Sequence, residues 1–312
     1  MKFLFLMDPL ETVVIEKDTT FAFMLESHQR GHEVYYLPED GISLWDGHLH
    51  FHTIKVKPQL VAHEPFIQER SEDLTDDQIH AIFIRTDPPF DQQYLINTWL
   101  LEFVPKHIPI INRPCGIRTV NEKIWAAQFT QFAPPTLISC HQGKLMDFIA
   151  EHKNIIAKPT DGYGGSSVFH IQPGDTNTKV ILEHLSNKWN SPMILQRYVP
   201  EAQNGDKRIL LLNGEPLGAL LRVHAANDHR NNIFAGGSCQ PAQMTARDKQ
   251  IMATLKPHLL ELGLYFVGID MLGDYLIEVN VTSPTCLQEM NKLYHQHLER
   301  KVIDFVEGLC KG

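Results

Sequence analysis

The chain has 312 residues, 43% hydrophobic and 21% charged, as is typical of a globular protein with room for two or three domains. Its formal net charge of −9, without a run of Lys and Arg, argues against nucleic acid as a partner. The apolar opening KFLFLM ends at Asp8, too short for a signal peptide or a membrane span, so no membrane association is expected. Five cysteines without a CxxC pair indicate reduced thiols and a cytoplasmic protein. The 17 histidines show no HExxH or comparable ligand spacing.

Residues 1–112 alternate strand and helix patterns. The patterns predict strands at 2–7, 33–37, 81–85 and 108–112, a hairpin at 42–55, and helices at 19–30 and 92–104. This βαβ order predicts a parallel sheet with helices on its faces. Ligands of such sheets bind at the carboxyl ends of the strands, where Asp8, Arg85, Asp87 and Asn112 fall. For any one of these residues, a plain turn is an equally good interpretation.

A glycine-rich segment, TDGYGGSS, lies at 160–167 between two predicted strands. Gly162, Gly164 and Gly165 would let backbone N–H groups converge on phosphate oxygens. Lys158, at the end of the preceding strand, favours a phosphate-binding loop. The spacing matches neither a P-loop nor a dinucleotide-binding GxGxxG, and an ordinary turn is the alternative. The surrounding pattern predicts strands at 136–139, 154–158, 168–171 and 193–199 and a helix at 143–152.

A second hairpin is predicted at 206–223, turning at an Asn-Gly pair, and its apolar strands carry Arg208 and Arg222. Arginine in such a strand needs a carboxylate or phosphate partner, and we favour anion binding over structural ion pairing. Residues 225–240, which include Arg230, are polar and predicted to form a mobile lid. Helices are expected at 246–262 and 297–309. The end of the 193–199 strand could read an adenine edge, although an ordinary buried strand is the favoured interpretation.

The stretch FVGIDMLGDYLIEVNVTSPT (266–285) predicts a hairpin of two apolar strands joined by a Gly-Asp turn. Glu278 and Asn280 share one strand face because they are two residues apart. Asp270 joins them only if it pairs with Glu278, which a two-residue loop alone does not allow. We therefore predict an odd-length loop or a bulge at 272–275. Three hard oxygen ligands on rigid strands favour Mg²⁺; in the alternative interpretation the acids merely face solvent.

Six segments, taken in order, carry a resemblance to a known family: MDP, RTDPPFD, NEK, KPTDGYGGSSVF, GDKRILLLNGEP and VGIDMLGDYLIEVNVTSPT. With them the chain resembles the bacterial glutathione synthetases of the ATP-grasp superfamily, over nearly its whole length. The resemblance implies an α/β protein with the ATP-grasp fold and an N-terminal parallel-sheet (pre-ATP-grasp) domain. It implies a substrate domain at 1–122, a central ATP-lid domain at 123–200 and a C-terminal metal and catalytic domain at 201–312.

The reaction implied by the resemblance joins γ-glutamylcysteine to glycine through an acyl phosphate, giving glutathione, ADP and phosphate. It implies ATP and Mg²⁺ (or Mn²⁺) as cofactors, small-molecule substrates, and a homo-oligomer, either a dimer or a tetramer. The implied roles are ATP contacts from Lys123, Lys158, Gly162, Gly164, Gly165, Gln196, Tyr198, Val199 and Asp206; metal ligation by Asp270, Glu278 and Asn280; charge compensation at the reacting atoms by Arg208 and Arg222; and substrate contacts from Arg85, Arg230, Asn280, Ser283 and Thr285.

Two positions depart from the family's pattern. Thr86 stands where the family usually has a lysine, and Ser238 stands where a basic residue usually follows the lid glycines. An ATP-grasp ligase with a different amino-acid acceptor therefore stays open as an alternative. A catalytically silent nucleotide-binding regulator is the alternative from another class, and it is opposed by the intact Lys158, Arg222, Glu278 and Asn280.

Overall fold

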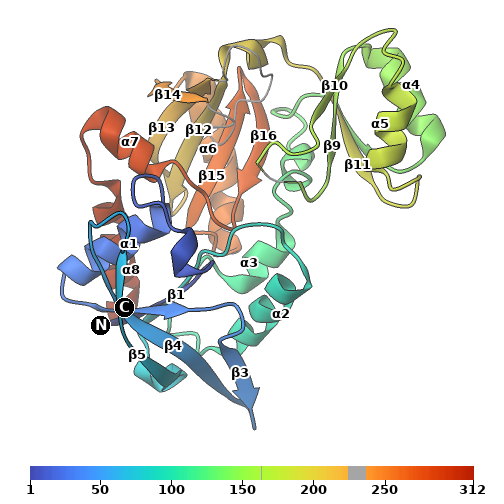
Figure 1. Ribbon diagram of the computed structural model, residues 1–312. Coiled ribbons are helices and arrows are strands. Elements are labelled where there is room, and N and C mark those ends of the chain that lie inside the picture. The colour runs from blue at the N-terminus through green and yellow to red at the C-terminus, as the bar shows by residue number, and fades with distance from the viewer. Residues whose placement is uncertain (163, 224–236) are drawn as a thin grey trace.

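Figure 1 shows the computed structural model of the protein, which describes residues 1–162, 164–223 and 237–312. These residues form three β-sheets that follow one another along the chain, one within each predicted domain. The architecture is α/β, as predicted, while the domain boundaries themselves stay predictions. None of the described helices is long and apolar enough to cross a membrane.

The first sheet is parallel at its centre and antiparallel on one side. Its strand order is β3-β4-β2-β1-β6-β7, with β5 paired to β4. The strands β2, β1, β6 and β7 run parallel, whereas β4 runs antiparallel to β2, β3 and β5, so the predicted parallel sheet is one part of a mixed one. The elements are β1 (Lys2–Leu6), α1 (Thr19–Gln29), β2 (Glu33–Leu37), β3 (Ile42–Trp45), β4 (His48–Pro58), β5 (Phe66–Thr75), β6 (Ala81–Ile84), α2 (Gln92–Leu100), β7 (Ile110–Ile111) and α3 (Pro114–Thr119).

The middle sheet is antiparallel and has a small core of its own. Its strand order is β10-β9-β11-β8, and two helices cover it. Buried residues from both helices and three strands, among them Leu145, Ile155, Leu182 and Leu195, form a cluster separate from the rest of the interior. This part therefore packs as a unit (Figure 1, right). The elements are β8 (Thr136–Ser139), α4 (Gln142–His152), β9 (Ile155–Pro159), β10 (Phe169–Ile171), α5 (Thr178–Leu185) and β11 (Met193–Arg197).

The third sheet is antiparallel and contains the predicted acidic hairpin. Its strand order is β14-β13-β12-β15-β16. The long helix α6 begins at a capping box in which Thr245 and Asp248 satisfy each other's backbone N–H groups. The elements are β12 (Asp206–Leu212), β13 (Glu215–Val223), β14 (Ser238–Pro241), α6 (Ala246–Glu261), β15 (Phe266–Leu272), β16 (Tyr275–Asn280), α7 (Leu287–Tyr294) and α8 (Leu298–Lys311).

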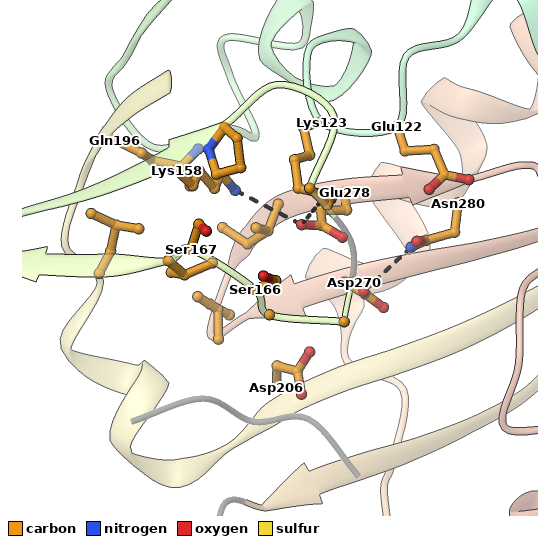
Figure 2. A pocket seen from close by; sticks show the side chains of 18 of the residues that line it. Glu122, Lys123, Lys158, Ser166, Ser167, Gln196, Asp206, Asp270, Glu278 and Asn280 are labelled. Atoms are coloured by element: carbon orange, nitrogen blue, oxygen red, sulfur yellow. Dashed lines mark hydrogen bonds and ion pairs between the residues drawn. The ribbon is translucent and has the colours of Figure 1, made fainter. Parts of the chain in front are cut away.

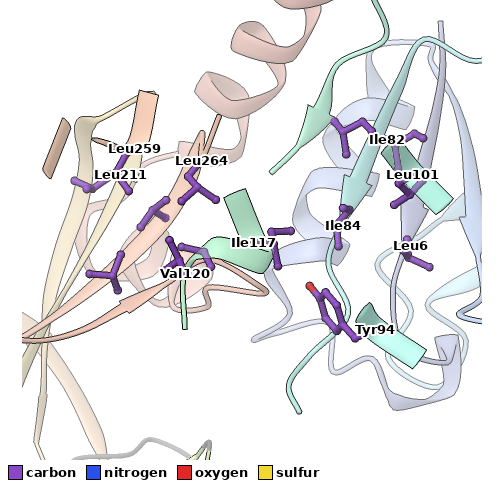
Figure 3. Packing of buried hydrophobic residues seen from close by; sticks show 14 of the residues in the cluster. Leu6, Ile82, Ile84, Tyr94, Leu101, Ile117, Val120, Leu211, Leu259 and Leu264 are labelled. Carbon is purple, nitrogen blue, oxygen red and sulfur yellow. The ribbon is translucent and has the colours of Figure 1, made fainter. Parts of the chain in front are cut away.

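The first and third sheets share one hydrophobic core. Figure 3 shows Leu6 and Ile82 of the first sheet in the same cluster as Leu211 and Leu264 of the C-terminal part, with α3 residue Ile117 between them. Burial of this apolar surface is the main force that holds the two sheets in a fixed relation. The cavity described below is therefore built on a rigid base.

Asn112 joins these two sheets by hydrogen bonds. Its buried side-chain amide donates to the carbonyls of Phe266 and Val281, at 2.8 Å each, and accepts from the Phe266 N–H at 2.7 Å. These bonds connect the end of β7 to the start of β15 and to the residue that follows β16. The side chain of Asn112, at the end of its strand, therefore holds the two sheets together rather than contacting a ligand.

Candidate functional site

A cavity of about 1390 Å³ is lined by residues of the middle and third sheets and of the loops that follow β6 and β16. It brings together most of the residues singled out from the sequence (Figure 2). Those that line it are Lys123, Lys158, Gly162, Gly164, Gly165, Gln196, Tyr198, Val199, Asp206, Arg208, Arg222, Asp270, Glu278, Asn280, Ser283 and Thr285. Arg85 is not among the lining residues, and Arg230 lies outside the described part of the chain.

The β15–β16 hairpin pairs Asp270 directly with Glu278. This is the pairing that the predicted metal site needs. The ladder is regular next to the Gly-Asp turn and shifts by one residue between Asp270 and Met271. The predicted bulge therefore exists, but it lies beyond 272–275, with Ile277 as the extra residue. Asn280 follows on the same strand, and its amide donates to Asp270 Oδ2 at 3.3 Å. The interpretation in which the acids merely face solvent is wrong for Asp270, which is 5% exposed.

Two arginines hold Asp270. Arg208 forms a two-bonded pair with its carboxylate, with Nη2 at 2.8 Å from Oδ2, and Arg222 Nη2 lies 3.0 Å from the same oxygen. Burial opposes ionisation of Asp270, but the two guanidinium groups outweigh it and hold its pKa below the ordinary value. Both arginines thus form the structural ion pairs that the sequence offered as the alternative to anion binding. Their catalytic role stays a prediction.

Asp206 completes the network on the far side of Arg222. Residues 206 and 222 are cross-strand partners, and Arg222 Nε donates to Asp206 Oδ1 at 3.0 Å. Burial raises the pKa of Asp206 to about 6, the charge of Arg222 works against the rise, and nearby Asp270 adds to it. In this position Asp206 orients Arg222, and its predicted contact with ATP stays a prediction.

Two lysines approach Glu278 from the opposite wall. Lys123 Nζ lies 3.4 Å and Lys158 Nζ 3.9 Å from Glu278 Oε1 (Figure 2). Lys123 also donates to the carbonyl of Gly162, which ties it to the glycine-rich loop. Burial lowers the pKa of the Lys158 ammonium, and the Glu278 carboxylate partly offsets this. Two ammonium groups below a loop of glycines form a surface suited to phosphate oxygens.

The predicted adenine-reading strand end also lies in the cavity wall. Gln196 Nε2 donates to Thr136 Oγ1 at 2.9 Å, and the Tyr198 ring stacks on His170 with centroids 4.2 Å apart. The Tyr198 backbone N–H donates to the Asn154 carbonyl at 3.0 Å. That donor is therefore already used, and an adenine edge would need another backbone group here.

Glu122 is a site residue that the sequence reasoning missed. One carboxylate oxygen, Oε1, accepts from the N–H groups of Val281 and Thr282 at 2.8 and 3.1 Å and from the Thr282 hydroxyl at 2.9 Å. The Val279 N–H donates to the Glu122 carbonyl at 2.9 Å. Glu122 thus fixes the chain on both sides of Asn280. The NEK motif was the available signal; it forms a turn followed by a 3₁₀ segment (Trp125–Gln128).

Arg85 lies behind the cavity rather than in it. It is 4% exposed, its Nε donates to Thr20 Oγ1, and its Nη2 donates to the Pro284 carbonyl, both at 3.0 Å. Burial lowers its pKa, and nearby carboxylates, Asp87 above all, partly offset this. The structure therefore does not bring Arg85 to the position of a substrate contact; it supports the loop that carries Ser283 and Thr285.

The predicted lid at 225–240 lies largely outside the described residues. Its last part is a strand rather than a loop, because Ser238–Pro241 form β14, which pairs with β13. Ser238 itself is exposed, and neither it nor Thr86 lines the cavity. The two departures from the family's pattern are thus outside the cavity wall.

The donor set of the hairpin fits a hard divalent cation. Two carboxylates and one amide oxygen come from adjacent positions on paired strands, and Mg²⁺ takes few protein ligands when phosphates and water supply the rest. No group of three or more His, Cys, Asp or Glu side chains is gathered for a metal within the described residues, so a cage made of protein ligands alone is absent there. These oxygens could hold such a cation together with a polyphosphate.

Comparisons with known proteins match the chain along nearly its whole length. The family model described as "Prokaryotic glutathione synthetase, N-terminal domain" matches residues 1–118, and that described as "Prokaryotic glutathione synthetase, ATP-grasp domain" matches residues 122–295. A glutathione synthetase of Pseudomonas aeruginosa is 39% identical over 302 residues, which cover 96% of this chain and 95% of the relative. One of Synechocystis is 37% identical over 317 residues, which cover 98% and 99%.

Two solved structures illustrate the fold that this chain shares with other proteins. The D-cycloserine synthetase DcsG has a TM-score of 0.68 at 14% identity, covering 98% of this chain and 100% of that one. The ATP-grasp ligase PsnB, in complex with a precursor peptide and AMPPNP, has a TM-score of 0.65 at 14% identity, covering 100% and 98%. At these identities the likeness is one of fold, and that fold is the predicted ATP-grasp.

Proposed function

Because the chain belongs to the prokaryotic glutathione synthetase family, we propose that it joins γ-glutamylcysteine to glycine, cleaving ATP to ADP and phosphate. The observation that carries the proposal is the set of residues that line the cavity. Lys123 and Lys158, a glycine loop, two arginines and the Asp270–Glu278 pair all face the same space. This is the charge distribution that phosphoryl transfer to a carboxylate needs.

The triphosphate would lie between the glycine loop and the hairpin. Lys123 and Lys158 would leave Glu278 for the α- and β-phosphates, since phosphate oxygens offer them more negative charge than one carboxylate. Backbone N–H groups at Gly164 and Gly165 would close over the phosphates. The adenine would lie toward Gln196, Tyr198 and Val199 at the end of β11.

Asp270, Glu278 and Asn280 would hold a divalent cation. We propose Mg²⁺, with Mn²⁺ able to replace it, because the three oxygen donors are hard ligands. When bound, the cation supplies positive charge at the β- and γ-phosphates of the nucleotide. The register of the hairpin aligns the three side chains, and the hydrogen bonds of Glu122 to the segment after Asn280 fix their backbone before the ligands bind.

The chemistry is the activation of a carboxylate and its capture by an amine. A carboxylate oxygen of the cysteine residue in γ-glutamylcysteine attacks the γ-phosphorus, and the bond to the β–γ bridging oxygen breaks, giving ADP and an acyl phosphate. The amine of glycine, after loss of a proton from its ammonium, attacks the acyl carbon, and phosphate leaves. Arg208 and Arg222 would offset the negative charge of the acyl phosphate and of the tetrahedral oxyanion. Ser283, Thr285 and Arg230 would contact substrate carboxylates.

An acyl phosphate is lost to water unless the cavity closes over it. The middle sheet has a core of its own and contributes β9, β11 and the glycine loop to the cavity, so it is suited to act as a cover that moves as one body. We further propose a cytoplasmic homo-oligomer, a dimer or a tetramer, whose only substrates are small molecules.

An ADP-release assay with γ-glutamylcysteine and a panel of amino acids tests the proposal. We expect ADP to form only when dipeptide and amine are both present, with glycine giving the highest kcat/KM. Another amino acid with a higher kcat/KM would establish a ligase of altered acceptor. Binding of ATP without ADP formation for any pair would establish a silent nucleotide-binding regulator.

A further inference from the structure

Three histidines share the outer face of β4, at the opposite end of the molecule from the cavity. His48, His50 and His52 alternate with Leu49 and Phe51, whose side chains are buried. Alternate residues of a strand point the same way, so the three imidazoles lie on the solvent side of the sheet, about 7 Å apart from one Cα to the next. On a helix, residues two apart point in different directions, whereas on a strand the spacing HxHxH places the imidazoles on one face.

His52 is oriented by an acidic side chain on the next strand. His52 and Asp73 are cross-strand partners in β4 and β5, and His52 Nδ1 lies 2.6 Å from Asp73 Oδ1. An ionised carboxylate only accepts hydrogen bonds, so Nδ1 of the neutral ring carries the proton and Nε2 keeps its lone pair. Nε2 accepts a bond of 3.0 Å from the Ser43 hydroxyl. Histidines that bind metals are commonly held in this way, with a carboxylate on the other nitrogen.

His50, unlike His52, is not held by a neighbouring polar side chain among the described residues. Its ring makes no hydrogen bond within the described part of the chain and lies beside Trp45, with ring centroids 6.3 Å apart. Trp45 is 71% exposed at the end of the β3–β4 hairpin. His50 lies two residues from His52 and on the same face of β4. None of these residues lines the nucleotide cavity, and Figure 1 shows β3 and β4 at the far end of the first sheet.

We propose that His50 and His52 form a two-imidazole chelate for a divalent transition-metal ion such as Ni²⁺, Cu²⁺ or Zn²⁺. Imidazole nitrogens suit these ions, whereas the hard oxygens of the hairpin suit Mg²⁺. Asp73 fixes the proton of His52 and adds negative charge beside the ion. Binding requires the Ser43 hydroxyl to turn away and the His50 ring to rotate on its exposed side. Two protein ligands and water complete the site, so the absence of a gathered three-ligand cluster in the described residues is no obstacle.

Trp45 provides the reporter for a test with Ni²⁺ on the full chain. A paramagnetic ion held beside an indole quenches its fluorescence, so titration of the wild type with Ni²⁺ should give saturable quenching. The His50→Gln variant should lose at least roughly tenfold in affinity, because it removes one of two ligands, and Asp73→Asn roughly tenfold, the usual effect of losing such a supporting carboxylate. His48→Gln should bind as the wild type does. Ligase activity, measured without Ni²⁺, should be the same in all of them.

Two variants show whether the signal comes from this site. Trp45→Phe should abolish the quenching while calorimetry still detects one bound Ni²⁺. His32→Gln removes an imidazole that lies 3.4 Å from the N-terminal amine, a second pair of neighbouring nitrogens, and it should change nothing. Wild-type affinity in His50→Gln, or loss of binding in His48→Gln or His32→Gln, would overturn the proposal.

Discussion

Asp270 and Glu278 lie opposite each other on one hairpin, but each has its own basic partners. Two arginines contact Asp270, and two lysines approach Glu278. Buried carboxylates are stable as anions only with such partners. The charges that line the cavity therefore balance one another, and the proposed nucleotide and cation would have to replace these internal ion pairs.

Glu278→Gln should abolish most turnover and leave the fold intact. The amide loses the negative charge that a cation ligand needs and leaves Lys123 and Lys158 without their acidic partner. We expect kcat to fall by orders of magnitude in the ADP-release assay, with an unchanged circular dichroism spectrum. Asp274→Asn is the matched control, because Asp274 lies in the exposed turn of the same hairpin and should keep full activity. Near-normal turnover in Glu278→Gln would exclude the metal assignment.

Glu122→Ala should lower activity through the position of Asn280. Three hydrogen bonds to Glu122 Oε1 hold the segment after Asn280, and misplacement of a reacting group by about 1 Å can cost about 100-fold in rate. We expect kcat/KM to drop by about that factor. Glu122→Gln keeps an acceptor oxygen and should recover most of the loss. Equal activity of the alanine and glutamine variants would contradict the positioning role.

Asp206 should give the stability of the protein a pH dependence in the mildly acidic range. Its pKa rises from 3.8 to about 6 on folding, so the folded chain holds the proton more tightly than the unfolded chain between these values. Stability due to this group is therefore greatest at low pH and is lost as the pH rises toward 6. At about 1.4 kcal/mol per pKa unit, the loss is on the order of 1–3 kcal/mol.

Urea unfolding of the wild type and of Asp206→Asn between pH 4.5 and 7.5 measures this effect. The unfolding free energy of the wild type, taken relative to the variant, should decrease up to about pH 6 and stay constant above it. A difference that does not change with pH would show that Asp206 titrates normally in the folded chain.

At the scale of elements, the sequence predicted the strands that carry the site and missed those at the edges. β2, β8, β12 and β13 have the predicted bounds because their apolar residues are bounded by turn residues. The edge strand β5 is missed because its outward residues are polar and only its ends are buried. The helices α5 and α7, of eight residues each, and the four-residue strand β14 were missed because they are shorter than the stretch over which a periodic pattern can be recognised.

Side-chain partners were harder to predict than strands. The need to align Asp270 with Glu278 predicted a bulge, although the extra residue is Ile277. The contacts of Glu122 with Thr282 and of Arg85 with Pro284 join positions 160 and 199 residues apart, so no local pattern announces them. For Arg85, the sequence predicts its place at the end of a strand, but not the direction in which its side chain points.

Gly205→Ala should damage the arginine pair through the β12–β13 ladder. Gly205 has φ +105°, and an added Cβ would lie 2.4 Å from the Arg222 carbonyl oxygen. The β-strands must shift there, so both the unfolding free energy and kcat should fall. Gly174→Ala is the matched control, since Gly174 also has a positive φ, +84°, but open space around it. It should lose only about 1–2 kcal/mol of stability and keep its activity. Equal effects of the two changes would contradict the steric reason.

At the scale of the whole molecule, the cavity lies between two parts: the joined first and third sheets, and the smaller middle sheet. The first and third sheets share a core and the Asn112 bonds, whereas the middle sheet has its own core. A ligand that touches both parts adds contacts that neither part can make alone. Binding should therefore tighten the whole chain.

Nucleotide and Mg²⁺ together should raise the melting temperature. At a free ligand concentration of 100 times Kd, binding adds about 2.7 kcal/mol to the unfolding free energy. Differential scanning calorimetry with ADP and Mg²⁺ should show the shift, and excess EDTA should remove most of it. Mg²⁺ alone should have little effect. A full shift with ADP in EDTA would indicate that the cation does not take part in binding.

The grip of Arg208 and Arg222 on Asp270 has a consequence for the order of arrival. A bare divalent ion that approaches Asp270 meets two guanidinium groups already bound to the oxygens it needs. An ion that arrives on a triphosphate brings anionic oxygens to which those guanidinium groups can turn. With Asp270 as the proposed metal ligand, the cavity would favour the preformed metal–nucleotide complex over its separate components, and the two arginines would keep other cations away from the carboxylate between turnovers.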